Sequence, residues 1–428
     1  MVEKCNTRNL RFRFCIILFE ALSTLVYGQN MKSNFLLLLV VILIACLAGV
    51  SSDIYIPSIP AMADDLMTNV EEVQWTLAIF MLGLSLSQLI YGPISDGVGR
   101  RCPLIIGLLI MTVSSVACFY APNIEMLIMG RFIQGLGAGA AASLWRSIFR
   151  DSFDGAHLAK YGGYLSILIP FIVPAAPMLG GYLQTYFGWR SSFLFIILYA
   201  LATLFIVFFL FKETSVHHHK ERLSRKFFLY AFGQLLSSRV FMGYSICTFL
   251  TYGAFFAWIT ASPVLLIKVV GITPVEFGWI TFLGGGGTMI LAGLANGKLV
   301  VKYGTHFMLR LGWALMFIAG SLMMALKFIY GINTVAIVAP AILFYFGSTF
   351  IWPSIFAGAF APFGKIAGYT GSLYSFMQLG GGAVISALVS YLPETNQVPL
   401  ASIFMACSAI AWIVFEYVVL SRDEVKAR

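Results

Sequence analysis

The stretch Gly92-Pro-Ile-Ser-Asp-Gly-Val-Gly-Arg-Arg101 is a short, glycine-rich and charged segment between two long apolar runs. The flanking runs, 74–94 and 104–121, are each close to the roughly 20 residues that an α-helix needs to cross a bilayer. So short a connection between two such runs predicts two neighbouring membrane-spanning helices joined by a tight turn.

The composition of the whole chain is that of a membrane protein. Apolar residues make up 60% of the sequence, charged residues make up 11%, and the mean hydropathy is +0.89. Soluble domains have about 25% charged residues. The pattern therefore predicts an all-α membrane protein without a separate soluble domain, whose twelve apolar runs are 35–55, 74–94, 104–121, 124–145, 162–184, 192–211, 241–262, 276–297, 306–326, 334–357, 369–391 and 399–420.

The basic residues are distributed unequally between the two sides of the membrane. If the N-terminus is cytoplasmic, all but four of the 27 Lys and Arg residues fall in the inner loops and tails. The four are Arg190, Lys268 and Lys327 outside and Arg131 within a span. This bias predicts that both termini are cytoplasmic. The net charge of +9 thus reflects membrane orientation, and a nucleic-acid partner is not expected.

Internal repetition divides the chain into two parts. Gly92 and Gly99 bracket the first loop, and Gly297 and Gly304 repeat that spacing in the second part of the sequence. Parallel repeats of this kind place a substrate site at their interface. We therefore expect two six-helix halves around a central cavity, and we expect the domain order to be an N-terminal extension at 1–34, an N-terminal half at 35–211, a cytoplasmic linker at 212–240 and a C-terminal half at 241–428.

The N-terminal extension has two interpretations. Basic residues precede an apolar stretch at 14–27 as in a signal peptide, but Glu20 interrupts that stretch. Met31, followed by an uninterrupted apolar run, is a more natural beginning. The first thirty residues are then an upstream extension from a misplaced start codon, or else a short interfacial helix.

Two charged residues are expected deep within spans. An ionised side chain at the centre of a bilayer costs roughly 2.5–3.5 kcal/mol on insertion scales, so it persists where it faces a cavity or a partner. Asp53 is the only carboxylate well inside a span apart from Glu416, and burial favours the protonated form of a carboxyl group. We predict that Asp53 carries protons; the alternative is a helix-end aspartate that bonds near Tyr55 or Ser58.

Arg131 is the cation that matches Asp53. Counted along the helix at 1.5 Å per residue, the two side chains fall at a similar depth, so we expect them to meet. In the alternative interpretation, Arg131 only anchors its helix to a neighbour.

The sequence contains no indication of a metal, a cofactor or an enzyme. The seven cysteines lack a C-x-x-C pair, and the histidines at 217–219 lack a partner cluster. There is no G-x-x-x-x-G-K-[ST] loop, so ATP is not the expected driving force. We expect no cofactor besides a proton gradient. The expected partners are protons, a small-molecule substrate and the lipid bilayer, and the expected oligomeric state is a monomer.

The loop at 92–101 is similar to the G-x-L-x-D-R-x-G-R-[RK] pattern of the major facilitator superfamily, and further stretches resemble its Bcr/CflA group of bacterial drug-resistance transporters. Two departures are Gly97, where an arginine is usual, and Ala176, where the broader antiporter pattern has glycine. The stretches that carry the resemblance are Ser52-Asp-Ile-Tyr-Ile-Pro57 with Pro60, Gln88 to Asp96 with Gly99-Arg-Arg101, Arg131 to Gly135 with Arg146 and Arg150-Asp151, and Ala176 to Gly181 with Trp189-Arg190.

The resemblance implies the major facilitator fold. It also implies proton-coupled efflux of small amphiphilic compounds or drugs across the bacterial inner membrane. Export of an endogenous metabolite or siderophore, or uptake by proton symport, is the alternative. The antiporter-type motif is carried by Pro177, Gly180 and Gly181.

The charged loop is expected to act as a conformational latch. Asp96 lies near the start of the third span, where it can accept backbone N–H groups and the Arg100 side chain. We expect it to hold the cytoplasmic side shut without touching the substrate, and the residues of this latch are Gly92, Asp96, Gly99, Arg100 and Arg101.

Aromatic residues in several spans are candidates for contact with the substrate. Such a lining suits greasy or cationic drugs, although aromatic residues that face lipid are ordinary in membrane helices. The candidates are Tyr55, Tyr252, Phe256, Tyr345 and Trp352.

Overall fold

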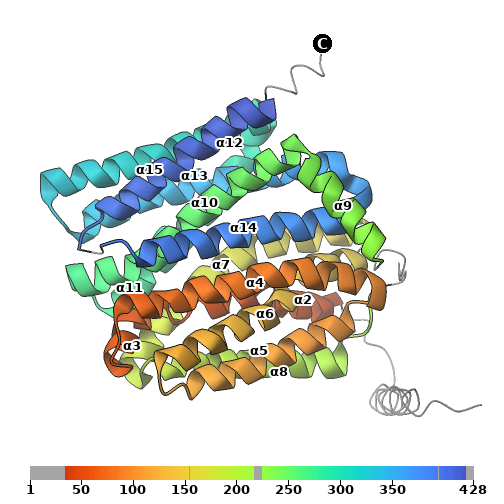
Figure 1. The fold of residues 1–428 in the computed structure, drawn as a ribbon, viewed down its shortest axis with the longest axis horizontal. Helices are drawn as coiled ribbons and strands as arrows, with labels where there is room; N and C mark the ends of the chain where they lie inside the picture. Colours follow the sequence, from red (N-terminus) through yellow and green to blue (C-terminus); the bar gives the residue numbers. More distant parts are fainter. Residues whose placement is uncertain (1–33, 154, 216–223, 394, 421–428) are drawn as a thin grey trace, which may run out of the picture.

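The computed structural model describes residues 34–153, 155–215, 224–393 and 395–420, and these residues form an all-helical bundle (Figure 1). The expected fold class is therefore confirmed. The two interpretations of residues 1–30, and the histidines at 217–219, concern residues outside the described ranges.

The first part of the bundle, called here the N-terminal half, contains six long helices. The first of them breaks after Asp53 and continues through a short 3-10 turn, η1, and a further helix, α3. The elements are α2 (Asn34–Asp53), η1 (Ile56–Ser58), α3 (Ile59–Asp65), α4 (Val70–Val98), α5 (Arg101–Phe119), α6 (Ile124–Ser152), α7 (Gly155–Phe187) and α8 (Arg190–Leu210).

The second part, called here the C-terminal half, contains three π-helical segments, which are η3, η4 and η6. Its elements are α10 (Arg239–Pro263), η3 (Val264–Val270), α11 (Pro274–Trp279), η4 (Ile280–Gly287), α12 (Thr288–Tyr330), α13 (Thr334–Phe360), η5 (Ala361–Ile366), α14 (Ala367–Ser390), α15 (Val398–Val414) and η6 (Phe415–Leu420).

The number of spans agrees with the twelve apolar runs of the sequence once one long helical stretch is counted as two spans. Within the described residues, eleven helical stretches are long and apolar enough to cross a membrane. One of them, Pro274–Tyr330, contains both expected spans 276–297 and 306–326. The backbone of Gly304 is non-helical there (φ 81°, ψ 166°), so this stretch turns between two spans.

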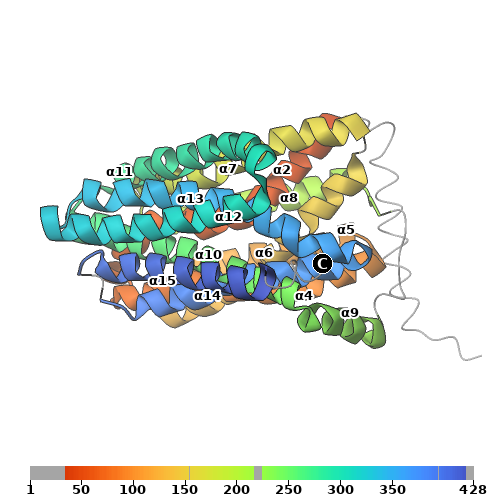
Figure 2. The ribbon, with the colours of Figure 1, turned by 90° about the horizontal axis from the view of Figure 1, so that it is seen from above.

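A helix that was not expected lies between the halves. Helix α9 (Arg225–Ser237) occupies the region expected to be a plain linker. Phe227, Phe228 and Phe232 contact the ring of Tyr369 on α14, with centroids 5.5–6.2 Å apart. Figure 2 shows α9 at the end of the bundle where α4 ends. Its unbroken apolar run, 227–232, ends at Gly233 and is too short for a search for runs of about 20 apolar residues to find.

The halves meet along two seams. Helix α4 lies beside α14, and α7 lies against α11 (Figures 1 and 2). Within the N-terminal half, α4 crosses α6 so closely that a side chain at Gly135 would collide with the carbonyl oxygen of Phe80. Small residues let membrane helices approach to this distance, where packing and not water exclusion holds them.

We predict that Gly135→Ala lowers the stability of the purified protein by about 1–3 kcal/mol, because the added methyl group forces α4 and α6 apart. Thermal unfolding in detergent measures the effect. Gly293→Ala is the control, since that exposed helical position has open space around it and gains from alanine's helix propensity. An unchanged melting temperature for Gly135→Ala would contradict the packing described.

Candidate functional site

Arg131 lies on α6 in the core of the N-terminal half and has no exposed surface. Its Nη1 donates to the carbonyl oxygen of Ser51 at 3.0 Å and to Oε1 of Gln134 at 2.5 Å. The guanidinium also lies over the rings of Phe80 and Tyr55, 4.1 and 4.5 Å from their centroids. Among the described residues, its Nε and Nη2 have no hydrogen-bond partner. The side chain is thus held by one backbone carbonyl, one amide and two aromatic faces.

Asp53 ends α2 and is 8% exposed. Its Oδ1 accepts a hydrogen bond of 2.5 Å from the Ser52 hydroxyl. The alternative, in which Asp53 bonds near Tyr55 or Ser58, is not supported by these two hydroxyl groups: that of Tyr55 pairs with Thr76 at 3.0 Å, and that of Ser58 has no partner in the described chain.

The structure contains no salt bridge between Asp53 and Arg131. Within the described residues they form no ion pair at 4.0 Å or less, although they are close enough to interact electrostatically. Arg131 instead bonds the backbone of Ser51, two residues before the carboxylate.

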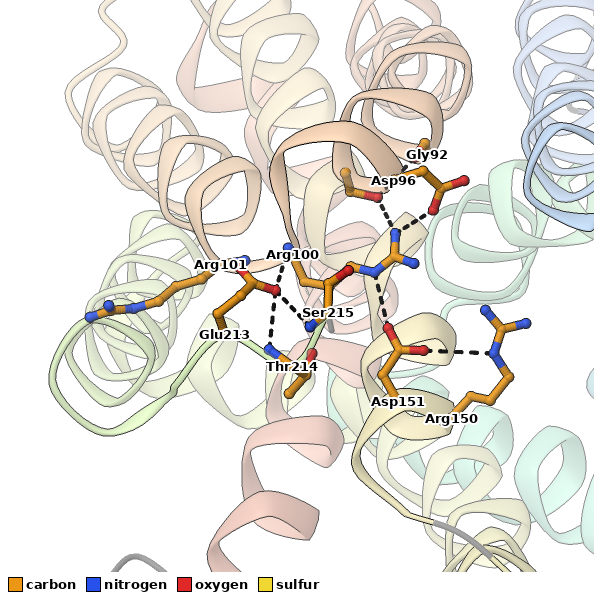
Figure 3. A network of polar contacts seen from close by, with 10 residues as sticks. Gly92, Asp96, Arg100, Arg101, Arg150, Asp151, Glu213, Thr214 and Ser215 are labelled. Carbon is orange, nitrogen blue, oxygen red and sulfur yellow. Dashed lines mark hydrogen bonds and ion pairs between the residues drawn. The ribbon is translucent and has the colours of Figure 1, made fainter. Parts of the chain in front are cut away.

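The charged loop forms an ion network (Figure 3). Nη1 of Arg100 donates to Oδ1 of Asp96 at 2.7 Å and to the Ser95 hydroxyl at 2.5 Å, and its Nε donates to Oδ2 of Asp151 at 3.2 Å. Arg100 is 6% exposed, and carboxylates from α4 and from the end of α6 neutralise its charge. The pairing of Asp96 with Arg100 that the sequence predicted is confirmed.

The backbone N–H groups at the start of α5 have a different acceptor from the one expected. Oε1 and Oε2 of Glu213 accept them from Arg100 and Arg101 at 2.8 and 3.0 Å, as Figure 3 shows. The expectation that Asp96 fills this role was wrong, because its carboxylate faces the Arg100 side chain. Gly99 has φ +96° and lies against the Glu213 carboxylate, so a side chain there is disfavoured both by the backbone conformation and by the lack of space.

Sequence reasoning missed Glu213 because it follows α8, more than a hundred residues after the loop. A helix N-terminus favours a nearby carboxylate, but this preference does not identify the residue that supplies it. Arg101 turns outward from the network and donates to the carbonyl oxygen of Phe208, also near the end of α8, at 2.7 Å. The loop is therefore fastened to the chain that leaves the N-terminal half.

The loop also touches the other half. Gly92 packs against the hydroxyl of Ser372 on α14, and Gly368 of α14 packs against Oδ2 of Asp96. Motion of α14 relative to α4 would disturb both contacts.

The antiporter-type motif lies at the seam between α7 and α11, at the opposite end of the bundle from the charged loop. Gly180 packs on the carbonyl oxygen of Ile54, directly after Asp53, and Gly181 packs on the carbonyl oxygen of Pro274 in the C-terminal half. Gly278 of α11 packs in turn on the carbonyl oxygen of Pro177. The motif therefore joins the helix break beside Asp53 to the opposite half at close range.

A cavity of about 690 Å³ opens between the halves at the end where the charged loop lies. Its volume is in the range usual for small-molecule sites. Asp96 of the charged loop is among its lining residues. The charged lining residues are Asp96, Arg100, Arg146, Arg150 and Asp151, and Phe356, Phe360 and Ser372 line the side of the C-terminal half.

None of the five aromatic candidates lines this cavity. Tyr55 is fully buried in the N-terminal half, with its ring centroid 5.7 Å from that of Phe193. The other four belong to an aromatic cluster of α10 and α13, in which Phe255 contacts Tyr345 and Trp352 at centroid distances of 5.6 and 5.3 Å. Tyr252 and Phe256 pack at 5.1 Å in the same cluster.

Comparison with known proteins identifies a matching family and relatives that are named for drug resistance. The family model described as Major Facilitator Superfamily matches residues 41–386. The chain is similar to a bicyclomycin resistance protein homolog of Haemophilus influenzae, with 27% identity over 94% of this chain and 100% of the relative. It is also similar to multidrug resistance protein D of Escherichia coli, with 28% identity over 86% and 91% of the two chains. A chloramphenicol resistance protein of Pseudomonas aeruginosa is 26% identical, over 88% of each chain.

Among solved structures, the chain is similar to the xylose transporter of Escherichia coli in a partially occluded inward-open conformation. The TM-score is 0.68 at 15% identity, over 90% of this chain and 97% of the other. A D-xylose–proton symporter matches with a TM-score of 0.69 at 16% identity, over 90% and 98% of the two chains. At these identities the likeness shows the fold alone.

We predict that Glu213→Ala speeds amide hydrogen exchange at Arg100 and Arg101 by about threefold or more, because the first amides of α5 lose their charged acceptor. Exchange measured by mass spectrometry tests this. Glu71→Ala removes a carboxylate from the first turn of α4, where it makes no side-chain hydrogen bond in the described structure, and should leave α5 unchanged. Equal exchange at Arg100 and Arg101 in wild type and Glu213→Ala would refute the role of Glu213 as a cap.

Proposed function

Because this chain belongs to the major facilitator superfamily of transporters, we propose that it exports small amphiphilic compounds across the inner membrane of a bacterium in exchange for protons. In this proposal it works as a monomer with both termini in the cytoplasm, and it needs no cofactor besides the proton gradient. The units that move against each other are 35–211 and 241–428.

The observation that carries the proposal is the position of Asp53. It is a carboxylate at a helix break, nearly buried, beside the fully buried Arg131 and without a salt bridge to it. A buried carboxylate without a partner cation exchanges protons readily when water reaches it from either side. The antiporter-type motif packs on the next residue, Ile54, and on the opposite half. A change at Asp53 is thus one contact away from the interface between the halves.

The asymmetry between the two ends of the interface gives a compound access from the cytoplasm, which an export cycle requires. At the end that the charge bias assigns to the outside, α7 and α11 pack backbone against backbone. The cavity opens at the other end, where a compound would enter from the cytoplasm. The relatives named for resistance to bicyclomycin, chloramphenicol and several drugs support drugs as the exported class.

Proton symport for uptake, or export of an endogenous metabolite, is the second candidate. The chain shares its fold with a D-xylose–proton symporter, and this match supports uptake by symport as the alternative. Reconstituted protein distinguishes the directions, because export by antiport acidifies the compartment from which the drug leaves, while symport acidifies the compartment that the drug enters.

We predict that Asp53→Asn abolishes transport driven by a pH gradient, because the amide keeps the size of the side chain and loses its proton exchange. A growth screen of a deletion strain against a panel that includes bicyclomycin and chloramphenicol first identifies an exported compound. Transport of that compound is then measured in proteoliposomes with an imposed gradient.

The matched control for this experiment is Asp64→Asn. Asp64 is the same residue type in the same span, but it is exposed. The control should transport like wild type. Gradient-driven transport that persists in folded Asp53→Asn protein would rule out Asp53 as the proton carrier.

The proposal also assigns the charged loop to the conformational change. We predict that Asp96→Ala slows transport of the identified compound several-fold while its equilibrium binding changes by less than about twofold. The carboxylate touches Arg100 and α14, and both contacts must be exchanged when the halves rock. A parallel loss of binding and transport would mean that Asp96 holds the substrate instead.

A further inference from the structure

The charges that line the cavity do not cancel. Asp96 and Asp151 are its two acidic residues, and both are engaged by Arg100 at 2.7 and 3.2 Å. The second oxygen of Asp151 lies 3.8 Å from the mostly exposed Arg150. These four residues together are neutral.

Arg146 is the remaining cation. It lines the cavity and is exposed to it, and in the described chain it has no carboxylate within ion-pair distance. The guanidinium lies 4.6 Å from the centroid of Trp145 on its own helix. The phenols of Tyr252 and Tyr374 in the C-terminal half are near enough to interact with it electrostatically. An exposed guanidinium without a carboxylate partner is available to bind an anion.

An aromatic wall shares the cavity with Arg146. Phe356 and Phe360 of α13 line it, with ring centroids 4.1 Å apart. The ring of Tyr374 on α14 contacts both, at 5.8 and 5.7 Å. Phe356 is 40% exposed, so its ring is free to contact a bound molecule. This wall belongs to the C-terminal half, whereas Arg146 belongs to the N-terminal half.

We propose that this cavity binds amphiphilic anions, with a carboxylate or similar oxyanion on Arg146 and an aromatic ring against Phe356 and Phe360. A guanidinium presents a planar fork of donors that matches a carboxylate, and offset or edge contacts between rings add to the burial of apolar surface. The inference rests on the proposed export function and gives its substrate class a sign of charge. It replaces the expectation of greasy or cationic drugs held by the aromatic candidates of α10 and α13.

The test is direct binding to the purified, detergent-solubilised protein with two probes of the same ring system. 2-Naphthoate carries a carboxylate, and 2-naphthylmethylammonium carries an ammonium group. Isothermal titration at neutral pH should give tighter binding of the carboxylate by at least about tenfold, the size expected for a hydrogen bond to a charged group.

Variants then locate the preference. Arg146→Gln should remove it, whereas Arg146→Lys should keep part of it, because lysine retains the charge but not the fork. Lys302→Gln removes an equal charge from an exposed position on α12 and should bind both probes as wild type does. Phe356→Ala should weaken both probes alike. Thermal unfolding confirms that each variant is folded.

Three results would overturn the inference: wild type that binds neither probe, wild type that binds the ammonium compound as tightly as the carboxylate, and folded Arg146→Gln that keeps the preference. Because no gradient is present, failure here leaves the export proposal standing. If the wild-type protein binds naphthoate as expected but shows no gradient-driven transport, the result counts against the export proposal and leaves this inference standing.

Discussion

The guanidinium of Arg131 is a charge without exposed surface, and four helices of the N-terminal half are arranged around it. It bonds the Ser51 carbonyl of α2 and lies over Phe80 of α4. Gln134 of α6, its amide partner, donates onward to the hydroxyl of Ser115 on α5 at 2.7 Å. Taking such a cation out of water costs several kcal/mol, which is offset only where its donors have acceptors. The break in the first span supports this arrangement, because it places Asp53 near the cation without joining the two.

In the proposed function, the interface between the halves links this local arrangement to transport. At one end the glycines of α7 hold the backbone of the helix break and of α11 in contact, and at the other end the cavity separates the halves. Arg146 lies fifteen residues after Arg131 on α6, or roughly 22 Å along the helix axis. A substrate anion at Arg146 therefore does not contact the side chains that surround Arg131. Coupling in this account therefore passes through the relative position of the halves.

The sequence predicted the parts of this structure that depend on neighbours along the chain. The apolar runs placed the spans, and Asp96 and Arg100, four residues apart, pair as their spacing indicated. What failed depends on distant segments: the cap from Glu213 and the helix α9, which packs on Tyr369 of α14. Arg146 was recognisable as part of a motif, but its lack of a partner became visible only once Arg100 was seen to engage both aspartates. The aromatic candidates were chosen by residue type, and residue type does not tell a ring packed against other rings from a ring that faces a cavity.

The central claim is that protonation of Asp53 sets the relative position of the two halves. The most direct test is the distance between spin labels at Lys160→Cys on α7 and Lys302→Cys on α12, two exposed positions in opposite halves, in an otherwise cysteine-free protein. Pulsed electron paramagnetic resonance should show a distance distribution that shifts between acidic and alkaline pH. In Asp53→Asn the distribution should stay at the acidic form at every pH, because the amide imitates the protonated carboxyl group. A pH-dependent shift of the same size in Asp53→Asn would contradict the account.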